Sequence, residues 1–200
     1  HLLSVEREAV QDAVIRLCES FQTVCEDFGG REFLFLQNLH VSETYIAARM
    51  QAMLGMNAHP IAGAEEKIAA IEKSRGMHYA AKQKEAIRAA LEQGILLLTG
   101  GPGTGKTTTL NAIIQLLQEA GEKVFLAAPT GRAAKRMSEV TGEEAKTIHR
   151  LLQVDWDEQD NPVFTRNERN PLECDCLVID ELSMVDAHLF ESVLRALPFS

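Results

Sequence analysis

The sequence predicts an α/β protein with a parallel sheet covered by helices on both faces, preceded by a small helix-and-hairpin module. Short, almost wholly apolar runs alternate with helical segments from about residue 78 onward, which is typical of a parallel sheet buried on both faces. A glycine-rich stretch lies between one such run and a helix. Two strand-like runs flank a double glycine nearer the start of the chain.

A helix and a hairpin are expected first. Residues 4–22 carry apolar side chains at helical spacing. The stretch that follows, FQTVCEDFGGREFLFLQ, reads as two strands joined at Gly29 and Gly30, because glycine accepts the backbone conformations of tight turns.

A second helix is expected to begin near Ser42, since serine often caps helix N-termini. Together these elements form a small, winged-helix-like module over residues 1–58, which would be marginal alone. Residues 59–77 are predicted to be a linker, and residues 78–200 the main domain.

The main domain alternates helices and strands. We expect helices over residues 80–93, 106–121, 131–140, 146–152 and 186–197. We expect apolar strands over residues 95–100, 123–128 and 176–180. The polar stretch 153–170 is consistent with a hairpin that turns near Asp160, Asn161 and Pro162.

The glycine-rich stretch, GGPGTGKT, matches the phosphate-binding P-loop pattern at Gly100, Gly105, Lys106 and Thr107. Glycines let successive N–H groups point into one concavity at the positive end of a helix. Lys106 would reach the β- and γ-phosphates, and the Thr107 hydroxyl would bind Mg²⁺. The residues expected to hold ATP phosphates are Gly101, Pro102, Gly103, Thr104, Gly105, Lys106, Thr107 and Thr108.

A second motif, LVIDE, is a buried strand that ends in two carboxylates. Next to a P-loop, an acid at such a strand end holds Mg²⁺, and we assign this role to Asp180. Glu181 would activate a water for attack on the γ-phosphate. The sequence contains no N-K-x-D guanine-reading motif, which disfavours a GTPase.

Four segments, GGPGTGKTTT, AAPTGRAAKRMSE, AKTIHRLL and LVIDELSMVD, resemble the first half of the motor of superfamily 1 DNA helicases. The similarity is greatest to the RecD/TraA group, whose members move 5′ to 3′ on single-stranded DNA. This resemblance covers residues 78–200 and implies a P-loop NTPase fold of the RecA-like kind. The preceding module is weakly similar to the N-terminal region of RecD-like proteins.

The resemblance also implies roles for individual residues. Gln83 occupies the place of the family's adenine-reading glutamine. The positions that match segments touching DNA are Pro129, Thr130, Gly131, Arg132, Lys135, Arg136, Thr147 and His149. Leu182 stands where the family more often has alanine, which leaves the carboxylates untouched. Trp156 in the polar stretch either stacks on a base or anchors the hairpin on the domain.

Composition places limits on partners and location. The net charge of −9 argues against a generally basic nucleic-acid binder, so contacts with single-stranded DNA must come from local clusters. The four cysteines lack zinc-site spacing, and we expect free thiols in a cytoplasmic protein. No apolar run approaches the ~20 residues that span a membrane. Nuclease or helicase partner subunits are expected by resemblance only.

Two alternatives to a RecD-like helicase stay open. One is the helicase part of a TraA-like conjugative relaxase, although residues 1–78 show only Tyr45 and scattered histidines for its nucleophile and metal site. The other is an ATP-gated DNA-binding or remodelling module that never unwinds DNA. Because the family's later motifs do not occur, we expect a truncated motor that binds nucleotide but hydrolyses it weakly and unwinds nothing alone.

Overall fold

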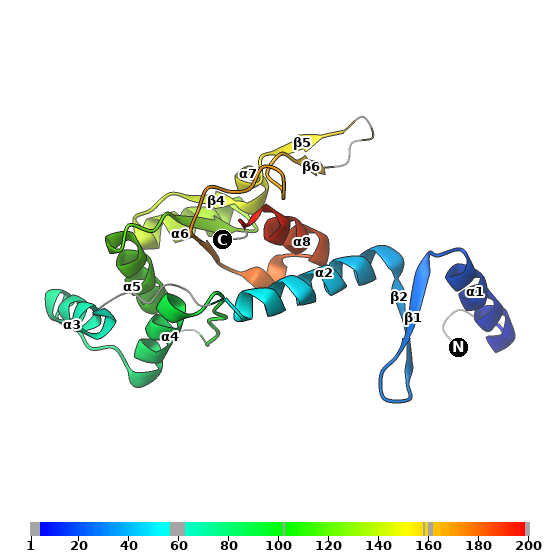
Figure 1. Ribbon diagram of the computed structural model, residues 1–200, viewed down its shortest axis with the longest axis horizontal. Coiled ribbons are helices and arrows are strands. Elements are labelled where there is room, and N and C mark those ends of the chain that lie inside the picture. Colours follow the sequence, from blue (N-terminus) through cyan, green and yellow to red (C-terminus); the bar gives the residue numbers. More distant parts are fainter. Residues whose placement is uncertain (1–4, 57–62, 102, 158, 160–161, 199–200) are drawn as a thin grey trace.

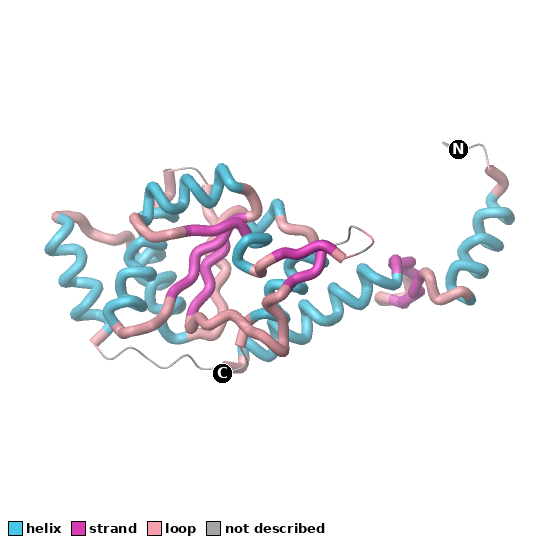
Figure 2. The backbone as a smooth tube through the Cα atoms, turned by 90° about the horizontal axis from the view of Figure 1, so that it is seen from above, coloured by secondary structure: helices cyan, strands magenta, loops and turns pink. Residues whose placement is uncertain are grey.

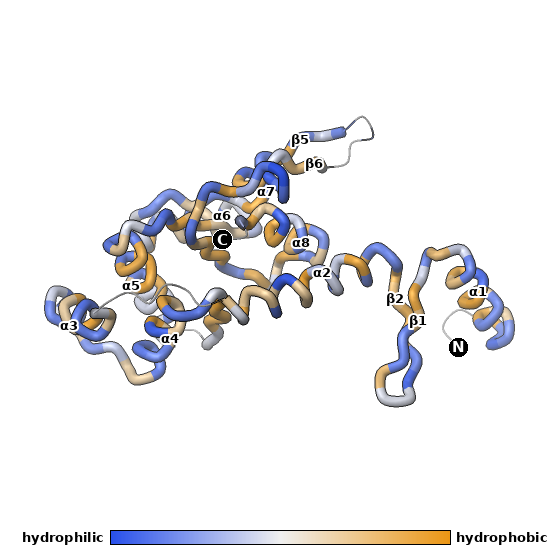
Figure 3. Tube along the Cα trace, in the orientation of Figure 1, coloured by the Kyte–Doolittle hydropathy of each residue, from blue (hydrophilic) through white to orange (hydrophobic). Residues whose placement is uncertain are grey.

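The computed structural model describes residues 5–56, 63–101, 103–157, 159 and 162–198. Its N-terminal elements extend away from the rest of the molecule (Figure 1). They are α1 (Arg7–Glu19), β1 (Thr23–Asp27), β2 (Glu32–Leu36) and α2 (Gln37–Leu54). The strands pair antiparallel, with Gly29 and Gly30 at positive φ in the turn, so the predicted hairpin is confirmed. Apolar residues occur along α1 (Figure 3), yet this helix buries none of them.

Helix α2 joins this extension to the main domain by packing against α8 (Ala187–Ala196). Ser42 lies inside α2, where it is buried; the prediction that it caps the helix is therefore wrong. Its hydroxyl donates to Glu191 Oε2 at 2.5 Å and contacts His188 Nδ1 at 2.9 Å. Further along α2, Arg49 Nη2 donates to the carbonyl oxygens of Leu197 and Pro198.

The central sheet has the strand order β4-β3-β7, and both pairs are parallel. Its strands are β3 (Val124–Ala128), β4 (Ala145–Thr147) and β7 (Cys176–Ile179). They lie side by side among the surrounding helices in Figure 2. The helices nearest to them are α5 (Lys106–Glu119), α6 (Gly131–Thr141), α7 (Ile148–Leu151) and α8.

Alternate residues of β3 face different helices. Leu126 packs with Ile114 of α5 and Met137 of α6. Ala127, which points to the other face, packs with Ile148 of α7 and Val193 of α8. The sheet is therefore covered on both sides, and the predicted α/β fold of a P-loop NTPase is confirmed.

A third core cluster joins α5 to α3 (Ala64–Arg75) and α4 (Ala81–Glu92) through Ile68, Ile87 and Leu116. Helix α3 lies within the segment predicted to be a linker, so most of that segment is helical and packed. The division at residues 58 and 77 otherwise stays a prediction. Glu72 of α3 accepts hydrogen bonds from the Tyr79 N–H and the Lys84 ammonium, which fixes α3 to α4.

The strand predicted over residues 95–100 is not formed: the segment is irregular, and Leu97 is 73% exposed. A strand needs a neighbour for its backbone hydrogen bonds. Among the described residues, no strand pairs with this segment. The apolar composition of residues 95–100 thus predicts a strand, but the neighbouring strand with which it would pair is absent from the described residues.

The polar stretch forms the predicted hairpin, with β5 (Val154–Trp156) antiparallel to β6 (Pro162–Phe164). The turn at Asp160 and Asn161 falls outside the described residues. The Trp156 side chain is 62% exposed, which does not support its use as an anchor; stacking on a base stays a prediction.

All four cysteines are free thiols, as expected, and burial raises the pKa of Cys174 and Cys176 to about 11. Within the described residues, no helix is both long and apolar enough to cross a membrane.

Replacing Ser42 by alanine should lower the free energy of unfolding by about 1–3 kcal/mol, because the Glu191 carboxylate and the His188 ring would lose the buried hydroxyl that they share. Chemical denaturation measures this change. Ser192→Ala is the matched control, since its hydroxyl bonds only to the His188 carbonyl of its own helix; it should change stability by less than about 0.5 kcal/mol. Equal losses in the two variants would contradict a role for Ser42 in joining α2 to α8.

Candidate nucleotide and nucleic-acid site

The glycine-rich loop turns directly into α5, which begins at Lys106. Gly103 and Gly105 have φ values of 73° and 79°, which side chains with a Cβ rarely adopt. Within the described part of the chain, the N–H groups of residues 103–108 have no hydrogen-bond acceptor. A run of such donors at a helix N-terminus suits an anion, so the loop fits the phosphate chain of a nucleotide. Pro102 lies outside the described residues.

The Lys106 ammonium folds back onto this loop. It donates to the carbonyl oxygen of Gly100 and, at 2.9 Å, to that of Gly101. The Thr104 hydroxyl also donates to the Gly101 carbonyl, at 2.9 Å. The ammonium is therefore bound by two carbonyl oxygens of the loop, and an incoming phosphate would compete with these oxygens for it.

Gln83 reaches the same loop from the first turn of α4. Its Oε1 accepts from the Ala80 N–H at 2.8 Å, and its Nε2 donates to the Thr104 carbonyl at 3.4 Å. A Cβ at Gly105 would stand only 2.3 Å from Gln83 Nε2. The structure thus brings the predicted adenine reader into contact with the predicted phosphate loop, although they are separated by about twenty residues in sequence.

Asp180 and Glu181 follow the carboxyl end of β7, and both are exposed. The Asp180 N–H donates to the Ala127 carbonyl at 3.0 Å, which continues the pairing with β3. Its Oδ1 accepts from the Glu181 N–H at 2.9 Å. Glu181 has a φ of 53°, a left-handed conformation that is costly for a residue with a Cβ and is often found at functional sites.

No hydrogen bond or ion pair connects Asp180 or Glu181 to the glycine-rich loop within the part of the chain that the structure describes. The predicted pairing of Thr107 and Asp180 around Mg²⁺ therefore stays a prediction. The same described residues contain no group of three or more histidine, cysteine, aspartate or glutamate side chains arranged around a metal.

The predicted DNA-contacting residues of α6 lie on its exposed face. Thr130 caps the helix, with its hydroxyl accepting from the Ala133 N–H at 3.2 Å. Arg132, Lys135 and Arg136 are exposed, whereas the opposite face of the helix is buried. Lys135 is 3.9 Å from Glu139, an exposed pair that neutralises little of its charge.

Thr147 and His149, the two predicted DNA contacts near α7, have structural roles as well. Thr147 caps this helix, since its hydroxyl accepts from the Arg150 N–H at 3.3 Å. The His149 ring lies 6.0 Å from that of Phe164 in the β5–β6 hairpin. His149 nevertheless remains exposed, which leaves it available for a second contact.

The sheet register collects these residues at one edge. Ala128 is paired with Thr147, and Ala127 with Ile179, so the three parallel strands end together. Pro129 and Thr130, the start of α7, and Asp180 therefore leave the sheet at the same edge. Ligands of open α/β sheets bind at this edge, beyond the carboxyl ends of the strands.

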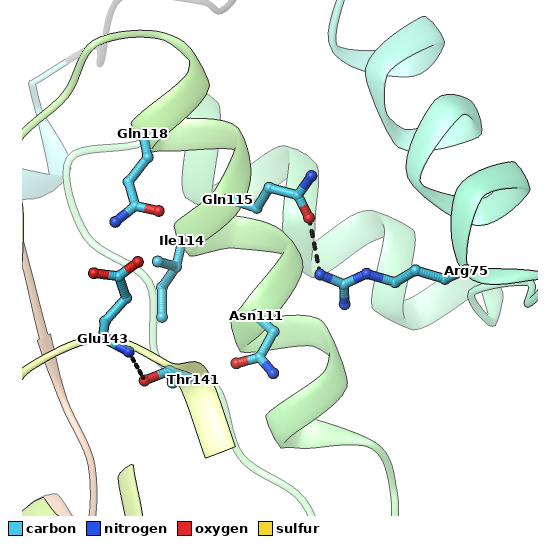
Figure 4. Close-up of a pocket in the computed structure, with 7 residues that line it drawn as sticks. All are labelled: Arg75, Asn111, Ile114, Gln115, Gln118, Thr141 and Glu143. Carbon is cyan, nitrogen blue, oxygen red and sulfur yellow. Dashed lines mark hydrogen bonds between the residues drawn. The ribbon is translucent and has the colours of Figure 1, made fainter. Parts of the chain in front are cut away.

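A cavity of about 220 Å³ lies elsewhere, along one side of α5 (Figure 4). Arg75 donates to Gln115 at its rim, and Asn111, Thr141 and Glu143 contribute to its lining. None of the predicted site residues lines this cavity, so its shape gives no support to a nucleotide there.

Comparison with known proteins agrees with the arrangement of the loop and the sheet. The model of the AAA domain family matches residues 83–200. The chain belongs to the AAA domain family. Membership of this family implies nucleotide binding, and the matched range of this AAA domain begins at Gln83 and includes both motifs.

The chain is also similar to RecD-type helicases, as its motifs indicate. It is 35% identical over 169 residues to the ATP-dependent RecD2 DNA helicase of Deinococcus radiodurans, covering 84% of this chain and 23% of that protein. It is 39% identical over 138 residues to the RecBCD enzyme subunit RecD of Mycolicibacterium smegmatis, covering 58% and 24%. The match to the ATP-dependent DNA helicase dda of phage T4 is 39% over 104 residues, covering 50% and 24%. The chain thus spans about a quarter of each relative's length.

Replacing Gly105 by alanine should weaken ATP binding by about 5- to 30-fold, because the positive φ is strained for a residue with a Cβ and the Gln83 amide would have to move away from the loop. Titration with a fluorescent ATP analogue measures the affinity. Gly101→Ala is the matched control in the same loop, since its Cβ would meet nothing within 4 Å and its φ is not positive. If both variants lost affinity equally, the loop geometry described above would not be the binding geometry.

Proposed function

We propose that this chain forms the nucleotide-binding part of an ATP-dependent DNA helicase that moves 5′ to 3′ along single-stranded DNA in cytoplasmic repair or recombination. The observation that carries the proposal is the row of N–H donors at the start of α5 that have no acceptor among the described residues, together with the Lys106 contacts to the same loop. The similarity to RecD-type helicases supports a DNA substrate. Nuclease or helicase subunits are the corresponding candidate partners.

ATP would bind with its phosphates against the N–H groups of residues 103–108 and its adenine edge near Gln83. Lys106 would leave the Gly100 and Gly101 carbonyls and transfer its ammonium contacts to the β- and γ-phosphates, at little net cost because one set of hydrogen bonds replaces another. Mg²⁺, with Thr107 and Asp180 as oxygen ligands, would neutralise charge on the same phosphates.

Glu181 would orient the attacking water and accept its proton. Its backbone N–H is tied to Asp180 Oδ1, and its left-handed conformation turns the chain sharply after the strand. Glu181 thus leaves the strand in a backbone conformation that differs from that of β7, which is compatible with one acid serving the metal and the other the water.

The DNA strand would run along the carboxyl edge of the sheet, past Thr130, Arg132 and the start of α7. Exposed cations on α6 would contact phosphates without reading bases, which suits movement along any sequence.

The decisive test is ATP hydrolysis by the full-length protein with and without single-stranded DNA, together with displacement of a strand from duplexes that carry a 5′ or a 3′ tail. Stimulated hydrolysis without displacement would favour an ATP-gated module, and displacement only from 3′ tails would overturn the polarity.

Lys106→Ala should weaken ATP binding by about 10- to 150-fold, because charge-assisted hydrogen bonds to the phosphates would be lost. Isothermal titration with a non-hydrolysable ATP analogue measures this loss. Lys82→Ala removes the same charge from an exposed position on α4 and should leave affinity unchanged. Wild-type affinity in Lys106→Ala would place the phosphates elsewhere.

Glu181→Gln should keep ATP affinity but slow DNA-stimulated turnover by about 10²- to 10⁴-fold, since the amide cannot accept the proton of the attacking water. Steady-state hydrolysis and analogue titration on the same preparation separate the two effects. Turnover at the wild-type rate would assign water activation to another residue.

A further inference from the structure

A pocket of about 260 Å³ lies on the face of the sheet that is covered by α7, and its lining is strongly basic. Four of its residues are cations and one is an anion, in a chain where Asp and Glu outnumber Lys and Arg by 29 to 20. The charged residues are Lys123, Lys146, Arg150, Arg166 and Glu173. Such a local reversal of charge is what an acidic protein needs in order to bind a polyanion.

The fold brings these cations together from distant parts of the sequence. Lys123 precedes β3, and Lys146 lies in β4, where it is paired with Ala127. Arg150 belongs to α7, and Arg166 follows the β5–β6 hairpin. The pocket therefore exists only in the folded domain, and no short motif encodes it.

The cations are only weakly neutralised. Glu173 lies 3.8 Å from Lys123 and 3.7 Å from Arg166, but its side chain is 75% exposed. Glu144 is similarly exposed and lies 3.5 Å from Lys146. Exposed pairs of this kind contribute little energy, so both acids can move aside. No acceptor for the Arg150 guanidinium occurs among the described residues.

One side of the pocket is preorganised. The Arg166 side chain is only 21% exposed, and its Nη1 donates to the Pro171 carbonyl at 3.0 Å. The backbone N–H of Arg166 also donates to the Leu152 carbonyl at 3.1 Å. Next to it, Gln153 lines the pocket with a φ of 55°, a strained conformation for a residue with a Cβ. Arg166 is therefore held in place before any ligand arrives.

We propose that this pocket binds phosphodiester groups of the nucleic-acid strand on which the protein acts. The proposal rests on the DNA substrate proposed above and adds a second phosphate-contacting surface beyond the predicted DNA residues. Lys146 and Arg150 directly flank Thr147 and His149 in the chain, so one end of the pocket adjoins two predicted DNA contacts, whereas Lys123 and Glu173 lie toward the amino ends of β3 and β7. The position of Lys146 and Arg150 next to these predicted contacts favours a nucleic acid over an acidic peptide as the occupant.

The chemistry of the lining also indicates phosphate contacts rather than base contacts. Phe125 is the aromatic residue that lines the pocket, and the Lys123 ammonium lies 5.4 Å from the centre of its ring. The ammonium therefore occupies that face of the Phe125 ring, so a base cannot stack on it. Contacts made by ammonium and guanidinium groups alone fix a backbone without reading its sequence.

The test measures how the affinity of the full-length protein for a fluorescent oligo(dT) depends on salt, by anisotropy. Lys146→Gln combined with Arg150→Gln should lower affinity and reduce the slope of log K against log salt by about 1.4, if both cations contact phosphates of a single strand. Lys146→Arg combined with Arg150→Lys keeps both charges and should retain most of the wild-type slope.

The matched control is Arg16→Gln combined with Lys73→Gln, which removes one arginine and one lysine from exposed positions on α1 and α3. It should leave the slope unchanged. Unfolding midpoints and DNA-independent ATP hydrolysis verify that each variant is folded. Should the first pair fail to fold, Lys123→Gln combined with Arg150→Gln tests the same pocket.

The outcomes separate this proposal from the proposed function. If the wild-type protein does not bind oligo(dT), the DNA substrate itself is wrong, and the pocket proposal falls with it. If the wild type binds but the pocket variant keeps the slope of the control, only the pocket proposal is overturned. Binding of inorganic phosphate alone, followed by ³¹P line broadening, with no change in the DNA slope would assign the pocket to a free anion and would also overturn it.

Discussion

The parallel register of β3 with β4 and β7 is the constraint on which the rest of the main domain depends. Because the three strands run the same way and end together, the segments that follow them leave the sheet side by side. Alternation along β3 then assigns α5 and α6 to one face and α7 and α8 to the other. A slip of one residue in this register would exchange the two faces and scatter the polar residues at the edge.

The main domain presents two regions of different chemistry, each of which we propose binds an anion. The start of α5 offers backbone N–H groups at short spacing, which suit the compact charge of a triphosphate. The α7 side offers long, separate cationic side chains such as Lys146 and Arg150, which suit charges spaced along a strand. Backbone donors remain when a side chain is substituted, whereas the second surface depends on the identity of each side chain.

Much of the fold and the turn of the glycine-rich loop into α5 could be predicted from the sequence, because both depend on local patterns. The glycine spacing, the apolar strand runs and the Gly29–Gly30 turn each encode a structure within a few residues. The predictions that were wrong concern structure that depends on contacts between residues distant in the sequence. Ser42 resembles a helix cap in sequence, yet its partners lie almost 150 residues away in α8. Residues 95–100 have strand composition but no paired neighbour, and the basic pocket unites residues from four separate segments.

Helix α2 has a mechanical consequence for the molecule. It packs along α8, the helix that follows Asp180 and Glu181 after a single short turn, and its contacts with α8 and the residue after it are made by Asn38, Ser42 and Arg49. Because these contacts begin at the hairpin end of α2 and are spread over about three turns, the two helices would move as one body. The N-terminal hairpin would therefore share any displacement of the helix that follows the acidic motif.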